Sequence, residues 1–127
     1  MRSVLVIEDN LEIRENTAEL LELSGYNVHT AHNGQEGFEE VQNYHPDVII
    51  CDIMMPGTDG LGFLKLIKNE TNTSKIPLIF FSADSAPTSV RKSIELGSDE
   101  YLRKPFTEEE LLESVERCLD WKKRMQA

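Results

Sequence analysis

The feature that most constrains the fold is a run of four apolar residues, VIIC at residues 48–51, which ends in Asp52. Because the run lacks the alternation of a strand with one wet face, it predicts a strand covered on both faces, as in parallel sheets. Pro56 and Gly57 then favour a tight turn, since proline presets one corner and glycine accepts a positive φ at the next. Ligands of open α/β sheets bind beyond the carboxyl ends of the strands, so Asp52 is a candidate site residue.

Four further segments have strand patterns, at residues 3–7, 26–31, 76–81 and 101–103. Between these segments and after the last one, apolar residues recur at helical spacing. Asn10, Asn33 and Thr107 are suited to cap the first, second and last of five predicted helices. A glutamate three residues after Asn33, and another three residues after Thr107, completes a capping box at the second and last of these helices.

The third helix is marked by apolar residues at positions 61, 64, 66 and 67, and the fourth begins near Pro87 and ends at Gly97. Residues 69–75 are polar and are expected to form a solvated connector. Five strands that alternate with five helices imply right-handed crossovers, and therefore a doubly wound parallel sheet with helices on both faces. A chain of 127 residues is expected to form one such α/β domain, residues 1–127.

The charge balance excludes several classes of partner. The chain has 23 acidic and 13 basic residues, a formal charge of −10, which opposes binding to nucleic-acid phosphates or to anionic membranes. No apolar run approaches the length needed to span a membrane, and the early acidic residues do not suit a signal peptide, so a cytoplasmic protein is expected. Cys51 and Cys118 are expected to be buried thiols in a reducing compartment rather than a disulfide.

Polar residues follow the carboxyl ends of four predicted strands: Glu8, Asp9, Asp52, Ser82 and Lys104. In a parallel sheet these ends share one edge, so the five side chains are expected to lie near one another. Taken alone, Glu8 and Asp9 are better explained as a solvated strand exit or a helix cap. Together with Asp52 and Lys104, they make this edge of the sheet a candidate site.

Four stretches carry a resemblance to a known family: VLVIEDN at residues 4–10, VIICDIMMPGTDG at 48–60, IFFSAD at 79–84 and SDEYLRKPF at 98–106. In this order and at this spacing they resemble the receiver domains of two-component response regulators, the CheY-like family, over the whole chain. The resemblance implies a flavodoxin-like sheet with the strand order 2-1-3-4-5.

The resemblance also implies that Asp52 accepts a phosphoryl group from the phosphohistidine of a sensor histidine kinase or a histidine phosphotransfer domain. Mg²⁺, or Mn²⁺, would be held by the side chains of Asp9 and Asp52 and by the backbone carbonyl of Met54, with Glu8 acting through a water. A carboxylate nucleophile needs such a cation because phosphoryl transfer depends on neutralising negative oxygens. By the same resemblance the protein is no enzyme for other substrates, and catalyses only its own phosphoryl transfer and autodephosphorylation.

Lys104 would pair with Asp52 and then with the phosphoryl group, and its peptide bond to Pro105 is expected to be cis. Met54 and Asp84, each two residues beyond a site residue, would set the phosphoryl lifetime. A thioether cannot orient an attacking water, so slow to intermediate hydrolysis is expected.

Ser82, Ala83 and Tyr101 would form the phosphoryl-binding switch. In the family, the hydroxyl moves toward the phosphoryl group and the aromatic ring moves inward behind it. The surface formed by the fourth helix, the fifth strand and the last helix would then change its affinity for a downstream output domain or protein, or for a second copy of the chain in a phosphorylation-dependent homodimer.

Three other functions compete with this one. A phosphatase with an aspartyl nucleophile would need an acid where Met54 stands. A flavin-binding module would need a hydroxyl-rich or glycine-rich phosphate loop, whereas EDNLE at residues 8–12 is acidic and repels phosphate. A receiver-like interaction module that is not phosphorylated is the remaining alternative, but it would be expected to lack Asp9, Asp52 or Lys104.

Overall fold

The computed structural model describes residues 2–53, 60–82, 91–92, 94–95 and 97–126, with side chains described as far as residue 120. Its centre is a five-stranded sheet in the order β2-β1-β3-β4-β5, in which every neighbouring pair is parallel. The strands are β1 (Ser3–Ile7), β2 (Asn27–Ala31), β3 (Val48–Asp52), β4 (Leu78–Ser82) and β5 (Glu100–Arg103). The predicted sheet and its strand order are confirmed.

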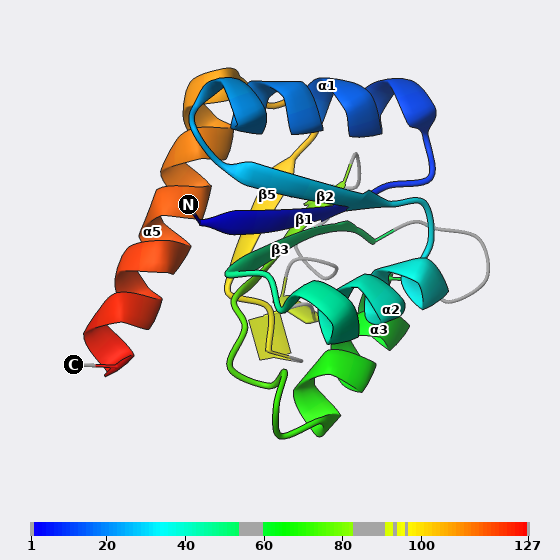
Figure 1. Ribbon diagram of the computed structural model, residues 1–127, viewed down its shortest axis with the longest axis vertical. Coiled ribbons are helices and arrows are strands. Elements are labelled where there is room, and N and C mark those ends of the chain that lie inside the picture. The colour runs from blue at the N-terminus through cyan, green and yellow to red at the C-terminus, as the bar shows by residue number, and fades with distance from the viewer. Residues whose placement is uncertain (1, 54–59, 83–90, 93, 96, 127) are drawn as a thin grey trace.

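Helices cover both faces of this sheet (Figure 1). One face carries α1 (Leu11–Leu23) and α5 (Glu108–Gln126), and the other carries α2 (Gly34–Tyr44) and α3 (Gly60–Asn69). The structure thus describes four helices, whereas the sequence predicts five. The predicted helix between Pro87 and Gly97 lies mostly outside the described residues, and the four residues described there, at positions 91–92 and 94–95, have helical backbone.

The predicted helix caps form as hydrogen bonds. The Asn10 side chain accepts from the backbone N–H of Ile13 at 3.0 Å, and the Asn33 side chain accepts from that of Glu36 at 2.8 Å. At α5, the Thr107 hydroxyl accepts from the backbone N–H of Glu110 at 3.0 Å, and the Glu110 carboxylate accepts from that of Thr107 at 3.1 Å. Each cap satisfies backbone donors that a helix start leaves without an intrahelical partner.

Two apolar clusters fill the space between the sheet and its helices. One cluster joins α1 and α5 to the sheet and includes Val48 and Ile50, while the other joins α2 and α3 to it and includes Ile49 and Cys51. Because side chains alternate along a strand, β3 contributes to both clusters, and all five of its residues are buried. By the same alternation, Asp52 leaves the sheet on the side of α1 and α5.

The two cysteines are buried and free of any disulfide, as expected. Cys118 packs in the cluster under α1 and α5, and burial raises the pKa of its thiol to about 12. This thiol is therefore protonated and unreactive at neutral pH.

One sequence-based expectation is wrong in detail, and the buried face of α3 includes a residue that the apolar pattern does not single out. In α3, Phe63 has no exposed surface, whereas Leu66 is 46% exposed. The connector at residues 69–75 is not fully solvated, because Thr73 is completely buried and its hydroxyl donates to the carbonyl of Ile67 at 2.7 Å. This bond satisfies a carbonyl in the last turn of α3 that has no intrahelical partner.

Candidate functional site

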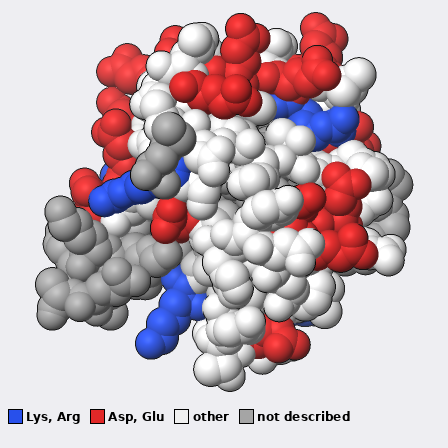
Figure 2. All heavy atoms as spheres, viewed as in Figure 1, with Lys and Arg blue, Asp and Glu red and all other residues white. Residues whose placement is uncertain are grey.

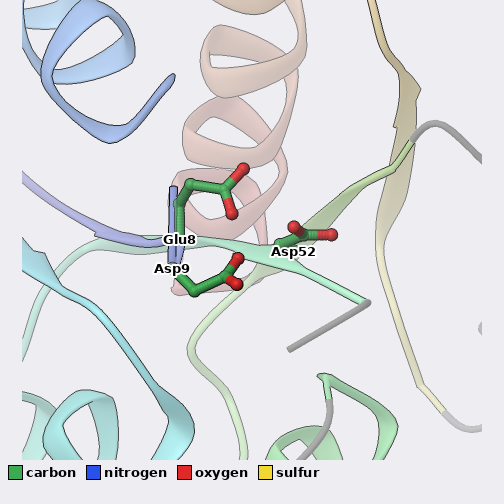
Figure 3. A group of neighbouring side chains, drawn as sticks. All are labelled: Glu8, Asp9 and Asp52. Carbon is green, nitrogen blue, oxygen red and sulfur yellow. The ribbon is translucent and has the colours of Figure 1, made fainter. Parts of the chain in front are cut away.

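Three carboxylates meet at the carboxyl edge of the sheet. Glu8 and Asp9 follow β1, and Asp52 ends β3, which lies beside β1. Figure 3 shows the three side chains close together, and each offers an oxygen within 4.8 Å of those of the other two. Glu8 and Asp52 are only 1% and 5% exposed, whereas Asp9 is exposed to solvent. The sheet therefore gathers the acids that the sequence predicts to be neighbours.

The side chain of Lys104 reaches this cluster from the loop after β5. Its Nζ lies 2.5 Å from Oε1 of Glu8 and 3.2 Å from Oδ2 of Asp52. The backbone N–H of Lys104 donates to the carbonyl of Ser82 at 2.8 Å. The Lys104–Pro105 peptide bond is cis, which is the conformation that the resemblance predicts. The ammonium thus lies between two nearly buried carboxylates and partly neutralises both.

The role of Glu8 goes beyond the expectation. The resemblance implies only a water-mediated contact between Glu8 and a cation, whereas in the structure the Glu8 carboxylate pairs directly with Lys104, at a shorter distance than Asp52 does. Arg14, which sequence reasoning did not single out, donates from Nη1 to the backbone carbonyl of Glu8 at 2.8 Å. That bond ties the first turn of α1 to the strand end that carries the acidic pair.

The three carboxylates of the cluster repel one another electrostatically. The pKa of the Asp9 carboxyl is raised above its usual range, first by its hydrogen bond to the Glu8 side chain, then by desolvation and by the charge of Glu8. Lys104 acts in the opposite direction but does not cancel the effect. A set of carboxylate oxygens with an excess of negative charge fits a small, hard divalent cation, which prefers oxygen ligands. The expected backbone ligand, Met54, lies outside the described residues.

The predicted switch residues are only partly described. Ser82 is the last residue of β4 and is 1% exposed. Tyr101 is half-buried and packs against the cluster under α2 and α3. Ala83 and Asp84 lie outside the described residues.

One further neighbour of the site was missed from the sequence. The Nζ atom of Lys104 lies over the ring of Phe81, 4.6 Å from its centroid. The ring is fully buried and makes an edge contact with Phe106, with centroids 5.8 Å apart. Within the apolar run IFF, no sequence signal distinguishes this phenylalanine from an ordinary core residue.

A groove of about 440 Å³ opens beside the cluster, between α1 and the loop that carries Lys104. Its walls are largely apolar and consist of Ile13, Asn16, Thr17, Leu20, Lys104, Pro105 and Phe106. Acidic side chains gather over α1 in Figure 2, where the exposed glutamates of this helix are Glu12, Glu15, Glu19 and Glu22. The surface beside the site is thus negatively charged around an apolar groove.

A family model described as the response regulator receiver domain matches residues 4–116, which is most of the chain. The chain belongs to this family. Among curated relatives, the receiver is 38% identical over 112 residues to protein PilG of Pseudomonas aeruginosa, an alignment that covers 88% of this chain and 83% of PilG. It is 32% identical over 118 residues to the phosphate regulon transcriptional regulatory protein PhoB of the same species, covering 93% of this chain and 52% of PhoB. The receiver thus spans about half the length of the PhoB relatives it matches.

Solved structures share the receiver fold. The chemotaxis response regulator CheY4 of Vibrio cholerae superposes with a TM-score of 0.88 at 31% identity, covering 94% of this chain and 99% of that one. A response regulator receiver domain protein from Clostridium thermocellum superposes with a TM-score of 0.91 at 30% identity, covering 98% and 99%. In the described part of the receiver, no helix has the length and apolar character needed to cross a membrane.

Proposed function

We propose that Asp52 accepts a phosphoryl group from the phosphohistidine of a sensor histidine kinase or of a histidine phosphotransfer domain. The observation that carries this proposal is a nearly buried aspartate at a strand end, 3.2 Å from a lysine ammonium and beside two further acids. A carboxylate can attack phosphorus only if the negative charge that gathers there is neutralised. Lys104 supplies a fixed positive charge for that purpose, first against Asp52 and then against a phosphoryl oxygen.

The acidic cluster would hold Mg²⁺, or Mn²⁺, through Asp9 and Asp52 together with the carbonyl of Met54, and Glu8 would act through a water. When bound, the ion neutralises phosphoryl oxygens and helps to align the phosphoryl group with the carboxylate. The raised pKa of Asp9 and the mutual proximity of the three acids support this assignment. Without a cation, the chain's own Lys104 offsets part of the repulsion.

The phosphohistidine donor would approach along the groove beside α1. This groove is lined by Lys104 itself, so a donor seated in it would lie next to Asp52. Its apolar walls suit the packing of a helix from the donor, and the acidic rim on α1 favours a donor with complementary basic residues.

Phosphorylation would act through Ser82, Ala83 and Tyr101. The hydroxyl of Ser82 would bind a phosphoryl oxygen together with the backbone of Ala83, and Tyr101 would move from its half-buried position to a more buried one. These movements would shift the population of conformations at the surface of the fourth predicted helix, β5 and α5. That surface would then bind a downstream output domain or protein, or pair with a second copy of the chain.

The protein would act in the cytoplasm and would catalyse only its own phosphorylation and autodephosphorylation. Direct contact with nucleic acid or membrane through this domain is disfavoured by the formal charge of −10. Met54 and Asp84 would set the lifetime of the phosphoryl group. Because a thioether cannot orient an attacking water, we expect hydrolysis to take longer than seconds without a phosphatase.

Transfer from a radiolabelled phosphohistidine donor, such as a phosphorylated histidine phosphotransfer domain, tests the proposal. Label should move to the wild-type protein in Mg²⁺, and should not move to Asp52→Asn or in the presence of a chelator. A protein that folds normally but takes no label from any phosphohistidine donor or from acetyl phosphate would instead be a receiver-like interaction module.

A further inference from the structure

The side chain of Lys104 passes over one strand of the sheet before it reaches the acids. Lys104 follows β5, whereas its two carboxylate partners stand at the ends of β3 and β1. In the strand order β2-β1-β3-β4-β5, the path from β5 to β3 passes over β4. Phe81 of β4 lies under this path, with its ring centroid 4.6 Å from Nζ. The ammonium of Lys104 therefore lies over the face of this ring.

The ring of Phe81 is held in place from two sides. In the register between β3 and β4, Phe81 pairs with Asp52, and both side chains leave the sheet on the side of α1 and α5. Phe106, two residues after Lys104, contacts the ring edge-on with centroids 5.8 Å apart and planes at 63°. The loop that carries the lysine thus also fixes the ring beneath it.

Glu8 attracts the ammonium toward β1, and the ring of Phe81 attracts it toward β4. Glu8 stands at the end of β1, two strands away from Phe81, and binds Nζ at 2.5 Å. The face of an aromatic ring carries partial negative charge and attracts a cation placed over it. Attraction to Phe81 therefore keeps the ammonium toward β3 and β4, where Asp52 lies, and opposes its withdrawal to Glu8.

We propose that Phe81 is a positioning residue for Lys104. Its ring keeps the ammonium between Glu8 and Asp52, and so beside the carboxylate that accepts the phosphoryl group. This inference rests on the proposed function and deepens it. Removing the ring while keeping an apolar side chain should let the ammonium move toward Glu8. Asp52 would then lose part of its neutralising partner.

Phe81→Leu and Phe80→Leu form a matched pair of variants. Both phenylalanines are fully buried in β4, but they belong to opposite faces of the sheet, and Phe80 packs in the cluster under α2 and α3. The two substitutions remove the same number of apolar atoms from a core. Only the first removes the ring under Lys104, so the comparison separates positioning from loss of packing.

Phe81→Leu should be phosphorylated by acetyl phosphate about three- to tenfold more slowly than Phe80→Leu at saturating Mg²⁺, a range set by the usual strength of a cation–ring contact. It should bind Mg²⁺ at least as tightly as the wild type, because Asp52 is less neutralised by the lysine. General damage to the fold would instead weaken both properties together. In a Lys104→Ala background, replacing Phe81 by Leu should have no further effect on the rate.

The contact itself has a separate readout in the metal-free protein. NMR should show upfield-shifted side-chain signals of Lys104 in the wild type and in Phe80→Leu, because protons over a ring face are shielded, and this shift should disappear in Phe81→Leu.

Equal phosphorylation rates in the two variants, or a full effect of Phe81→Leu without Lys104, would overturn the inference. If even the wild type takes no phosphoryl group, the proposed function fails. The Mg²⁺ comparison and the NMR shift would then still decide whether Phe81 positions Lys104.

Discussion

Replacing Asp9 by alanine should stabilise the metal-free protein. The oxygens of Glu8, Asp9 and Asp52 lie within 4.8 Å of one another, and two unit charges at that distance repel by about 3 kcal/mol at an effective dielectric near 20. Asp9 is exposed and Lys104 offsets part of the repulsion, so we discount the gain to about 1 kcal/mol. For a domain of this size, that gain corresponds to a melting temperature about 4 °C higher.

Thermal and urea unfolding in chelator measure this gain. Glu19→Ala, on the exposed face of α1, is the matched control because it removes one negative charge far from the cluster. In Mg²⁺ the order should reverse, since bound cation stabilises the wild type by an amount that depends on its affinity, and Asp9→Ala has lost a ligand. If Asp9→Ala is no more stable in chelator than Glu19→Ala, the acids do not repel as the geometry indicates.

Three further outcomes are expected. The folded-state pKa of Asp9 lies above its ordinary value of 3.8, so Asp9 contributes most to stability below pH 3.8, and this contribution is lost as pH rises through the folded-state pKa. In chelator, the stability advantage of Asp9→Ala should therefore shrink as pH falls from 7 toward about 4. Lys104→Ala leaves Glu8 buried without its closest cation, so it should lower the free energy of unfolding by about 1–3 kcal/mol in urea titrations and abolish rapid phosphorylation of Asp52. Thr73→Val should cost about 1–2 kcal/mol in the same titrations, because a buried carbonyl at the end of α3 loses its donor, while phosphorylation stays unchanged.

The sequence is sufficient to predict the sheet and the proximity of the three acids. Apolar runs of strand length fix where strands lie, and the carboxyl ends of parallel strands share an edge, so Glu8, Asp9 and Asp52 had to be neighbours. The caps at Asn10 and Asn33 were predictable because they depend on contacts only three residues apart.

The remaining details depend on tertiary packing. In residues 61–67, LGFLKLI, too many positions are apolar to reveal which face of the helix is buried, so the sequence does not distinguish the exposed Leu66 from the buried Phe63. The direct bond between Glu8 and Lys104 joins residues 96 positions apart, and the path of the loop after β5 decides it. Phe81 lies within an apolar run, and the sequence pattern does not show that its ring lies under the ammonium of Lys104.

The most direct test is to find which residue becomes phosphorylated. Incubation with acetyl phosphate and Mg²⁺, followed by borohydride reduction and peptide mass spectrometry, marks an aspartyl phosphate by converting that aspartate to homoserine. We expect a single mark at residue 52, absent in chelator and absent in Asp52→Asn. A mark at another residue, or none in a folded wild-type protein that binds Mg²⁺, would contradict it.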